Sequence, residues 1–302
     1  TNPSVNISLK DLQLSWHRFK ILNYERLPPL YNISSAQDAQ WSPDGIHIAF
    51  RSYVNGMANI YLLNVNHQNK QQLTHNIDVY HFEWLNQNEI LLQSSNHQVY
   101  LLDTKTSHSS AIPCLNGFLD VSPDGSQIVT VDNPSIELSD DFTQLVIADL
   151  DCSDKTIIVE QTIDICDASW SPKGDEILFV NYGRTVGGHT CNQIYRISTD
   201  GTNQFRVDNN DFSSKYQATW SPDGEKIAYA ANENEAQDIY IIDRNGNDLI
   251  RLTNSPIYDQ YPVWSPNGDK LAFGFVDYNR NQSGIYIYSV ANSKLKPIAI
   301  NQ

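Results

Sequence analysis

The sequence contains a single methionine, Met57, and it begins with threonine. We therefore expect that an upstream segment was removed, either a signal peptide or a preceding domain. The sequence also lacks an apolar run of about 18 residues, so no part of it is expected to span a membrane.

Positive charge is scarce, because 20 Lys and Arg residues stand against 35 Asp and Glu residues and give a net charge of −15. Nucleic acids and anionic membrane surfaces are bound by clusters of Lys and Arg, and no basic run occurs here. The composition therefore argues against both partners and favours a soluble domain with a cationic partner.

The motifs of common catalytic and metal sites are missing. The four cysteines form no Cys-x-x-Cys pair, and no Cys/His spacing matches a structural zinc site. No Gly-x-Ser-x-Gly nucleophile elbow occurs. We predict no catalytic residue, no metal ligand and no cofactor.

What the sequence does contain is a repeat of the string W-S-P-D-G. Close copies begin at residues 41, 121, 170, 220 and 264, and a degenerate copy, WLNQN, occupies residues 84–88. The spacings between successive copies are 43, 37, 49, 50 and 44 residues, which is the period of a four-stranded propeller blade. The lead residues are Trp41, Trp84, Val121, Trp170, Trp220 and Trp264.

Each copy is followed by three short runs rich in β-branched and aromatic residues. After Trp220 these runs are KIAYA (226–230), DIYIIDR (238–244) and LIRLT (249–253), and Gly, Asn, Asp and Pro separate them. No segment shows a long period of 3.6 residues. The pattern predicts an all-β fold, a six-bladed β-propeller with four antiparallel strands per blade.

The turn and the lead tryptophan have separate physical roles. Proline fixes φ at the second turn position, and Asp-Gly or Asn-Gly supplies the left-handed conformation that reverses the chain. The tryptophan ends the first strand, where we expect it to pack between neighbouring blades. A single blade cannot bury both of its faces, so the blades must stack into a closed ring.

The combined pattern resembles the TolB-type repeat family. Blade 5 matches it nearly in full, with the motif at 220–224, Asp238-Ile-Tyr240, Asp243, Gly246 and Arg251-Leu-Thr253. The resemblance covers residues 35–300 and implies a TolB-like propeller domain over residues 35–302. Blade 2 departs by lacking Pro-Asp-Gly, and blade 3 departs by lacking the lead tryptophan.

Residues 1–34 lie outside the repeat and are expected to form a lead-in or tether. Within them, residues 11–22 are interpreted as a strand pair or as a tether packed on the ring, and the alternative is a plain linker. The TolB family's N-terminal α/β domain does not fit into 34 residues, which argues against a direct Tol-Pal role.

The loops of a four-stranded blade divide between two faces of the ring. The W-S-P-D-G turns share one face, here called the turn face. The hairpins between second and third strands share the other, called the hairpin face, with the connections between blades. The longest hairpin-face loops are predicted at 132–143, 181–192 and 276–284, in blades 3, 4 and 6. Such loops are where rigid scaffolds usually carry binding sites, although they are also tolerated as simple insertions.

Candidate ligand-binding residues cluster at the mouth of the central channel and in the blade 4 loop. Acidic and aromatic side chains there are suited to bind a cationic peptide or small ligand, or they only cap strand ends and hold water. The TVGGHT segment of the blade 4 loop is interpreted as a flexible surface loop. The candidates are Asp38, Tyr80, His81, Asp164, Asp167, Arg184, His189, Tyr216, Asp259 and Tyr261.

Histidines and cysteines offer two weaker signals. Some propeller lyases that resemble this repeat hold a divalent metal on histidines, but the histidines on the hairpin face are spread around the ring and show no ligand spacing. Cys166 and Cys191 belong to one blade and form either a disulfide or free, partly buried thiols. Cys152 is expected on the opposite face, bonded to neither.

These features favour a non-catalytic binding or sensing module that uses the hairpin face and the channel mouth. One version docks protein partners, and the other is the periplasmic sensor domain of a CadC-like membrane-bound transcriptional regulator. The alternative is a propeller enzyme, a polysaccharide lyase or hydrolase with a metal or acidic site at the channel mouth. A periplasmic location is expected, either soluble or tethered by an upstream membrane helix.

Overall fold

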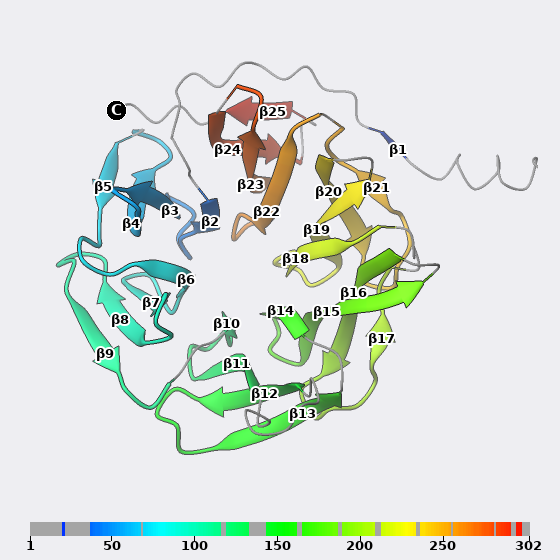
Figure 1. The fold of residues 1–302 in the computed structure, drawn as a ribbon, viewed down its shortest axis with the longest axis horizontal. Coiled ribbons are helices and arrows are strands. Elements are labelled where there is room, and N and C mark those ends of the chain that lie inside the picture. Colours follow the sequence, from blue (N-terminus) through cyan, green and yellow to red (C-terminus); the bar gives the residue numbers. More distant parts are fainter. Residues whose placement is uncertain are drawn as a thin grey trace, which may run out of the picture.

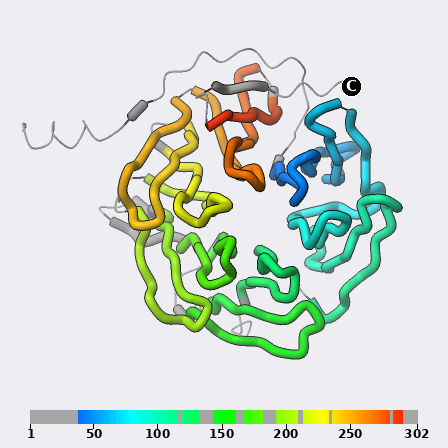
Figure 2. The backbone as a smooth tube through the Cα atoms, turned by 180° about the vertical axis from the view of Figure 1, so that it is seen from behind, coloured from blue at the N-terminus to red at the C-terminus, as the bar shows by residue number. Residues whose placement is uncertain are grey.

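The computed structural model describes residues 20–21, 37–67, 69–115, 119–132, 143–161, 165–186, 189–208, 213–233, 236–254, 256–280, 282–290 and 294–297. Within these residues the secondary structure consists of strands, and no helix long and apolar enough to cross a membrane is found. Six sheets are arranged as blades around a central axis, as both views show (Figures 1 and 2). This arrangement confirms the predicted six-bladed propeller.

Every blade is an antiparallel meander whose first strand lies innermost (Figure 1). Blade 1 comprises β2 (Gln37–Trp41), β3 (His47–Val54), β4 (Met57–Asn64) and β5 (Lys70–Gln72). Blade 2 comprises β6 (Val79–Trp84), β7 (Glu89–Ser94), β8 (Val99–Asp103) and β9 (Ser109–Ile112). Blade 3 comprises β10 (Asp120–Val121), β11 (Gln127–Asp132), β12 (Thr143–Asp149) and β13 (Lys155–Gln161).

The second half of the ring repeats the same order. Blade 4 comprises β14 (Ile165–Trp170), β15 (Glu176–Val186), β16 (His189–Ser198) and β17 (Phe205–Arg206). Blade 5 comprises β18 (Lys215–Trp220), β19 (Lys226–Glu233), β20 (Ala236–Asp243) and β21 (Ile250–Arg251). Blade 6 comprises β22 (Tyr258–Trp264), β23 (Lys270–Asp277), β24 (Gln282–Ser289) and β25 (Lys294–Pro297).

One short strand precedes the ring. β1 (Lys20–Ile21) pairs in parallel with β21 and adds a fifth, outermost strand to blade 5. It falls within the segment interpreted as a strand pair or as a tether packed on the ring, and the rest of that segment lies outside the described residues. All four strands of blade 6 come from the C-terminal part of the chain, so the ring closes by packing between blades 6 and 1.

The repeated turns owe their shape to serine and glycine as well as to proline. In blade 1 the amide of Gly45 donates to the carbonyl of Ser42 at 2.8 Å, and Gly45 has φ of 70°. The Ser42 hydroxyl accepts a hydrogen bond from the His47 amide at 2.9 Å and donates to Asp44 at 2.5 Å. A side chain at Gly45 would begin 3.7 Å from the Pro266 ring of blade 6, so the turns also contact one another around the ring.

The apolar core is divided into six clusters, one at each joint between neighbouring blades. Trp220 of blade 5, for example, packs with Leu178 and Ile194 of blade 4, and Trp41 packs with Ala272 and Ile285 across the closing joint. The tryptophans at 41, 170, 220 and 264 are 5–7% exposed. The prediction that the lead tryptophans pack between blades is therefore confirmed for these four.

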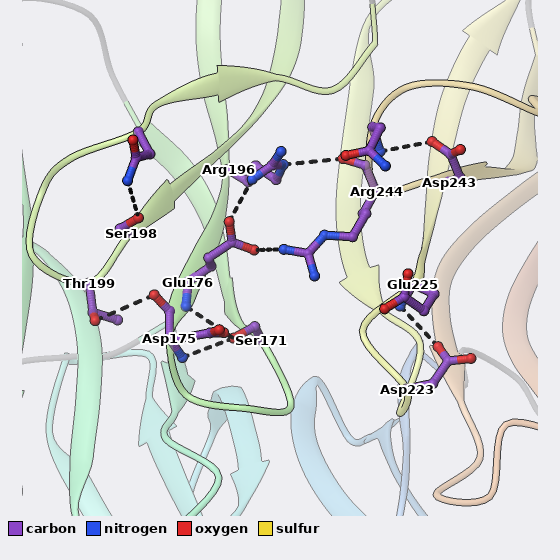
Figure 3. Close-up of polar contacts among 12 residues, drawn as sticks. Ser171, Asp175, Glu176, Arg196, Ser198, Thr199, Asp223, Glu225, Asp243 and Arg244 are labelled. Carbon is purple, nitrogen blue, oxygen red and sulfur yellow. Dashed lines mark hydrogen bonds and ion pairs between the residues drawn. The ribbon is translucent and has the colours of Figure 1, made fainter.

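A charged network reinforces the joint between blades 4 and 5 (Figure 3). Glu176 is 7% exposed and accepts hydrogen bonds from Arg196 at 2.6 Å and from Arg244 of blade 5 at 2.5 Å. Arg196 also donates to the Arg244 carbonyl at 3.2 Å, and the Arg244 guanidinium lies 5.7 Å from the centre of the Trp220 ring. Hydrogen bonds between charged groups of this kind are shorter and stronger than those between neutral groups.

The Asp-Ile-Tyr and Arg-Leu-Thr strings of the repeat meet inside a blade. In blade 5 the carboxylate of Asp238, which is fully buried, accepts hydrogen bonds from Arg251 at 2.6 Å and from Thr253 at 3.0 Å. The Thr253 hydroxyl in turn accepts from the Ile239 amide at 2.9 Å. These contacts explain physically why the two strings recur together, because each satisfies buried polar groups of the other.

Candidate functional site

The first strand of five blades is interrupted by a β-bulge at a similar position, two to four residues before the lead residue. Register shifts occur in β2, β6, β14, β18 and β22. In three of them the bulged residue is not glycine yet has positive φ, at 52° for Asp38, 53° for Gln217 and 54° for Tyr261. Bulges of this kind redirect side chains and are frequent beside functional sites.

The bulges and the residues next to them form what we call the axial cluster. Its side chains come from the innermost strands and from β3 next to them, and they lie beside the axis of the ring. The members are Asp38, Arg51, His81, Glu83, Asp120, Asp167 and Tyr261.

Arg51 of β3 is the cation of this cluster, and it joins blade 1 to blade 2. It forms an ion pair with Asp38 and donates hydrogen bonds to the carbonyls of Val79, at 3.2 Å, and Tyr80, at 2.5 Å. Burial raises the pKa of Asp38, and the charge and hydrogen bond of Arg51 oppose that rise. The guanidinium therefore binds one carboxylate of blade 1 and two carbonyl groups of blade 2.

His81 faces the same axis from β6 of blade 2. Its Nε2 lies 2.8 Å from the carbonyl oxygen of Leu119 in blade 3, so this nitrogen carries the proton and donates. Burial lowers the pKa of His81 to about 4, so the ring is neutral at pH 7. A neutral imidazole adds no positive charge to the cluster.

Three further carboxyl groups project from blades 2, 3 and 4. Glu83 accepts a hydrogen bond from Gln40 at 2.5 Å, and Asp120 accepts from the Trp170 amide at 2.6 Å. Burial raises the pKa of Asp120 to about 6, and burial together with the Asp120 charge raises that of Asp167 to about 7. Burial and the Asp120 charge also raise the pKa of Glu83 well above its ordinary range.

Tyr261 completes the cluster from blade 6. Its amide donates to the side chain of Gln217 in blade 5 at 2.9 Å, which ties the two bulges together. Burial, followed by the negative charge of Asp38, raises the pKa of the Tyr261 hydroxyl well above its ordinary value. The phenol therefore stays protonated, and its hydroxyl donates a hydrogen bond to the Asp38 carboxylate.

The structure brings together four of the predicted site residues. Asp38, His81, Asp167 and Tyr261 belong to the axial cluster, and Tyr80 lies beside Arg51 with 63% of its surface exposed.

Two further candidates are less exposed than Tyr80. Asp259 is fully buried, and Tyr216 is partly buried and packs against the apolar core between blades 5 and 6. A ligand-binding role for these two residues stays a prediction.

The remaining candidates fall outside what the structure describes. Asp164 lies outside the described residues, and so do the side chains of Arg184 and His189. Their backbone is described, and it corrects the prediction of a flexible loop: β15 and β16 extend the hairpin, with Arg184 opposite Cys191 and Val186 opposite His189. Thr185, Val186 and Thr190 are β-branched residues, which suit a strand better than a loop.

Sequence reasoning missed Arg51, Glu83 and Asp120. Glu83 and Asp120 stand directly before their lead residues, as Gln40 does in blade 1. Reading the first strands in steps of two from the residue before the lead residue would have found this polar row, because alternate residues of a strand share a face. Arg51 lies in a second strand and carries no such signal.

The cysteines show a pairing that was not anticipated. Cys114 and Cys152 form a disulfide with Cα atoms 6.2 Å apart, which links blade 2 to blade 3. The side chains of Cys166 and Cys191 lie outside the described residues, so their bond stays a prediction. In the described part of the chain no group of three or more His, Cys, Asp or Glu side chains is arranged to hold a metal ion.

The raised pKa values of the axial carboxyls make a pH-dependent stability measurable. The folded state binds protons that the unfolded state has released, so the free energy of unfolding should fall as the pH rises from 6.5 to 8. Each such proton contributes at most about 1.4 kcal/mol per pH unit. His81, with its lowered pKa, acts in the opposite direction only between about pH 4 and its ordinary value, below this window.

Urea unfolding of the Asp167→Asn variant tests this expectation. We expect a shallower decline between pH 6.5 and 8 than in the wild type, because the group with a pKa near 7 is gone. Asp223→Asn is the control, since the pKa of Asp223 is lowered and its carboxyl stays ionised across the whole window. Equal slopes in all three proteins would contradict the expectation.

Comparison with known proteins agrees with this architecture. A family model described as the TolB β-propeller domain matches residues 31–221 and 137–302 of the chain. The Tol-Pal system protein TolB of Anaeromyxobacter dehalogenans is 29% identical over 121 residues, which is 40% of this chain and 26% of that protein. The matched segment thus spans about a quarter of the length of this relative.

Solved structures share the fold at low identity. TolB from Acinetobacter baumannii superposes with a TM-score of 0.64 at 19% identity, covering 88% of this chain and 64% of that one. An oligogalacturonate lyase in complex with manganese gives a TM-score of 0.61 at 17% identity, covering 90% of this chain and 77% of that one. At such identities the likeness concerns the fold alone.

Proposed function

Because this chain belongs to the TolB β-propeller domain family, we propose that it is a non-catalytic binding module that docks a cationic segment of a partner protein. The segment contacts the axial cluster from the hairpin face of the ring. The fold supports a binding role in general, and the chemistry of the cluster supports the cationic partner.

The observation that carries the proposal is the convergence of four carboxyl groups from four consecutive blades. Asp38, Glu83, Asp120 and Asp167 are close enough for the other three charges each to raise the pKa of Glu83. Arg51 is already bonded to Asp38 and to two carbonyls. A Lys or Arg side chain from a partner would supply the positive charge needed to balance these carboxylates.

The surroundings of the cluster favour a protein segment over a bare cation. Large apolar side chains are exposed at the tip of the β3–β4 hairpin, where Tyr53 and Val54 are each 42% exposed. The Ala58 amide, opposite Tyr53 near the tip of this hairpin, donates to Asp78 at 2.8 Å, which holds the hairpin beside the start of β6 and the exposed Tyr80. Aromatic anchors beside a charged site are typical of protein-binding surfaces.

A peptide-binding experiment with two glutamate variants tests the proposal. The probes are two fluorescent nonapeptides with the same central tyrosine, one flanked by lysines and the other by glutamates, and anisotropy gives Kd. Glu83→Gln should raise the Kd of the lysine peptide about tenfold, which corresponds to about 1.4 kcal/mol of binding free energy. Glu225→Gln, an exposed glutamate on the turn face, makes the same charge change and should leave Kd unchanged.

Two results would count against this function. Either equal weakening by both glutamine variants or equal binding of the lysine and glutamate peptides would mean that the axial carboxyls are not the site. A thermal-shift screen of the folded protein with small cationic compounds provides the comparison with a small-ligand role, because a ligand that binds only the folded state raises its stability.

We place the module in the periplasm, and the Cys114–Cys152 disulfide supports an oxidising compartment. In the sensing version of this function, the propeller is the periplasmic domain of a membrane-bound, CadC-like transcriptional regulator. The full gene sequence tests that version: a cleavable signal peptide without a membrane helix would rule it out.

The enzyme alternative rests on no specific contact in the described residues. It predicts a stoichiometric divalent metal, and His81 is the histidine nearest the axial carboxyls, 3.7 Å from Glu83. Elemental analysis after incubation with manganese decides between the two functions. Bound metal that is lost in a His81→Ala variant would favour the enzyme over the binding module.

A further inference from the structure

The six joints of the ring are not equally well packed. In the described residues the clusters at the other joints contain eight or eleven buried apolar residues, whereas the cluster between blades 2 and 3 contains five. Its members are aliphatic, namely Leu91, Val99, Leu115, Val121 and Ile128.

The sequence explains why this joint is small. Val121 stands where four of the other blades carry a buried lead tryptophan, and a valine side chain removes much less apolar surface from water. Blade 2 also lacks the proline that packs on the next turn in other blades. A Cβ on Gly125 would instead lie 3.2 Å from the Leu85 carbonyl.

The same joint carries the Cys114–Cys152 disulfide. Cys114 follows β9, the outermost strand of blade 2, which runs along the rim toward blade 3 (Figure 1). Cys152 sits at the tip of the turn between β12 and β13 of blade 3. Both cysteines are exposed, so a reductant can reach the bond.

We propose that the Cys114–Cys152 disulfide is a redox latch that holds blades 2 and 3 together. With the bond formed, the joint is closed despite its small apolar core. With the bond reduced, this joint opens while the joints built on buried tryptophans stay closed. A hydrogen bond from His81 to the Leu119 carbonyl also spans the joint in the described residues.

The chemistry of the latch is thiol–disulfide exchange with a dithiol. One thiolate of the dithiol attacks a cysteine sulfur and forms a mixed disulfide, and its second thiolate then releases the remaining cysteine. Two electrons pass to the protein, the dithiol becomes a cyclic disulfide, and its two protons end on Cys114 and Cys152. An oxidising partner of the same class runs the exchange in reverse.

The latch also bears on the axial cluster. Glu83 belongs to β6 and Asp120 to β10, so the two carboxyls lie on opposite sides of the joint. Opening the joint separates them and alters the surface that a partner would meet. This one consequence rests on the proposed function, whereas the latch itself does not.

Hydrogen exchange measured by mass spectrometry on the full chain, with and without dithiothreitol, tests the latch. Reduction should speed exchange at least tenfold in peptides covering 109–121 and 155–161, and leave peptides from β19 and β20 unchanged. A Cys114→Ser/Cys152→Ser variant should exchange like the reduced protein, and its exchange rates should not change when dithiothreitol is added. A Cys166→Ser/Cys191→Ser variant should keep the wild-type response.

The latch is refuted if reduction of the wild type leaves exchange at 109–121 unchanged, or if exchange rises equally in all six blades. The comparison of oxidised and reduced wild-type protein does not depend on whether any variant folds. Because this readout involves no ligand, a failed latch leaves the peptide result standing. Failure of lysine-peptide binding to the oxidised protein would count against the docking function alone.

Discussion

Replacing Trp220 by alanine should lower the free energy of unfolding by about 3–5 kcal/mol. Trp220 is 5% exposed and packs in a cluster of eleven buried residues between blades 4 and 5. Its indole nitrogen makes no hydrogen bond to the residues that the structure describes, so the expected loss is one of packing. The substitution also removes the surface under the Arg244 guanidinium.

Chemical denaturation monitored by circular dichroism measures this loss, and Trp84→Ala provides the comparison. Trp84 holds the same place in its repeat but is only partly buried. The loss of unfolding free energy in Trp84→Ala should therefore be smaller than that in Trp220→Ala by at least roughly 1 kcal/mol, in proportion to the smaller area removed from water. An equal loss at both positions would show that the lead tryptophans do not act through packing between blades.

Replacing Asp238 by alanine is expected to have a comparable effect, a loss of about 3–5 kcal/mol. The carboxylate is fully buried and accepts hydrogen bonds from Arg251 and Thr253. Without this carboxylate, the Arg251 guanidinium, which is 17% exposed, and the fully buried Thr253 hydroxyl lose their shared acceptor. A buried charge that loses its partner is more costly than the pair was favourable.

Blade 1 offers a neutral counterpart for this test. Asn59 occupies the corresponding place, and its side-chain oxygen accepts a hydrogen bond from the Thr74 hydroxyl at 3.4 Å. Asn59→Ala should cost about 1–2 kcal/mol, as expected for neutral hydrogen bonds. Urea unfolding of both variants gives the comparison, and a loss at Asp238 no larger than that at Asn59 would contradict the role assigned to its charge.

The number of blades, their order and their turns could be predicted because they follow from local chemistry. Ser42, Gly45 and their equivalents make contacts within five residues of one another, so the string that encodes a turn is also the turn. The β-branched residues Thr185, Val186 and Thr190 in blade 4 were local information too, but the TVGGHT segment was interpreted as a flexible loop, whereas β15 pairs with β16 as far as Val186 and His189.

The axial cluster was predicted only in part because its members are far apart in the sequence. Arg51 meets Asp38 and the carbonyl of Tyr80 only after blade 2 has packed against blade 1. The shared rise in the pKa values of Glu83, Asp120 and Asp167 requires three blades to face one axis. No spacing in the sequence encodes that convergence.

The repeat period and the turn residues were sufficient to identify a ring of six four-stranded blades, since strands and turns form from neighbouring residues. Closure of the ring decided everything that depends on two blades at once. It buried Asp259, set carboxyls from four blades beside one axis, and brought Cys114 to Cys152 across 38 residues of chain. Such contacts depend on how twisted sheets pack against one another, and short sequence patterns carry no record of that packing.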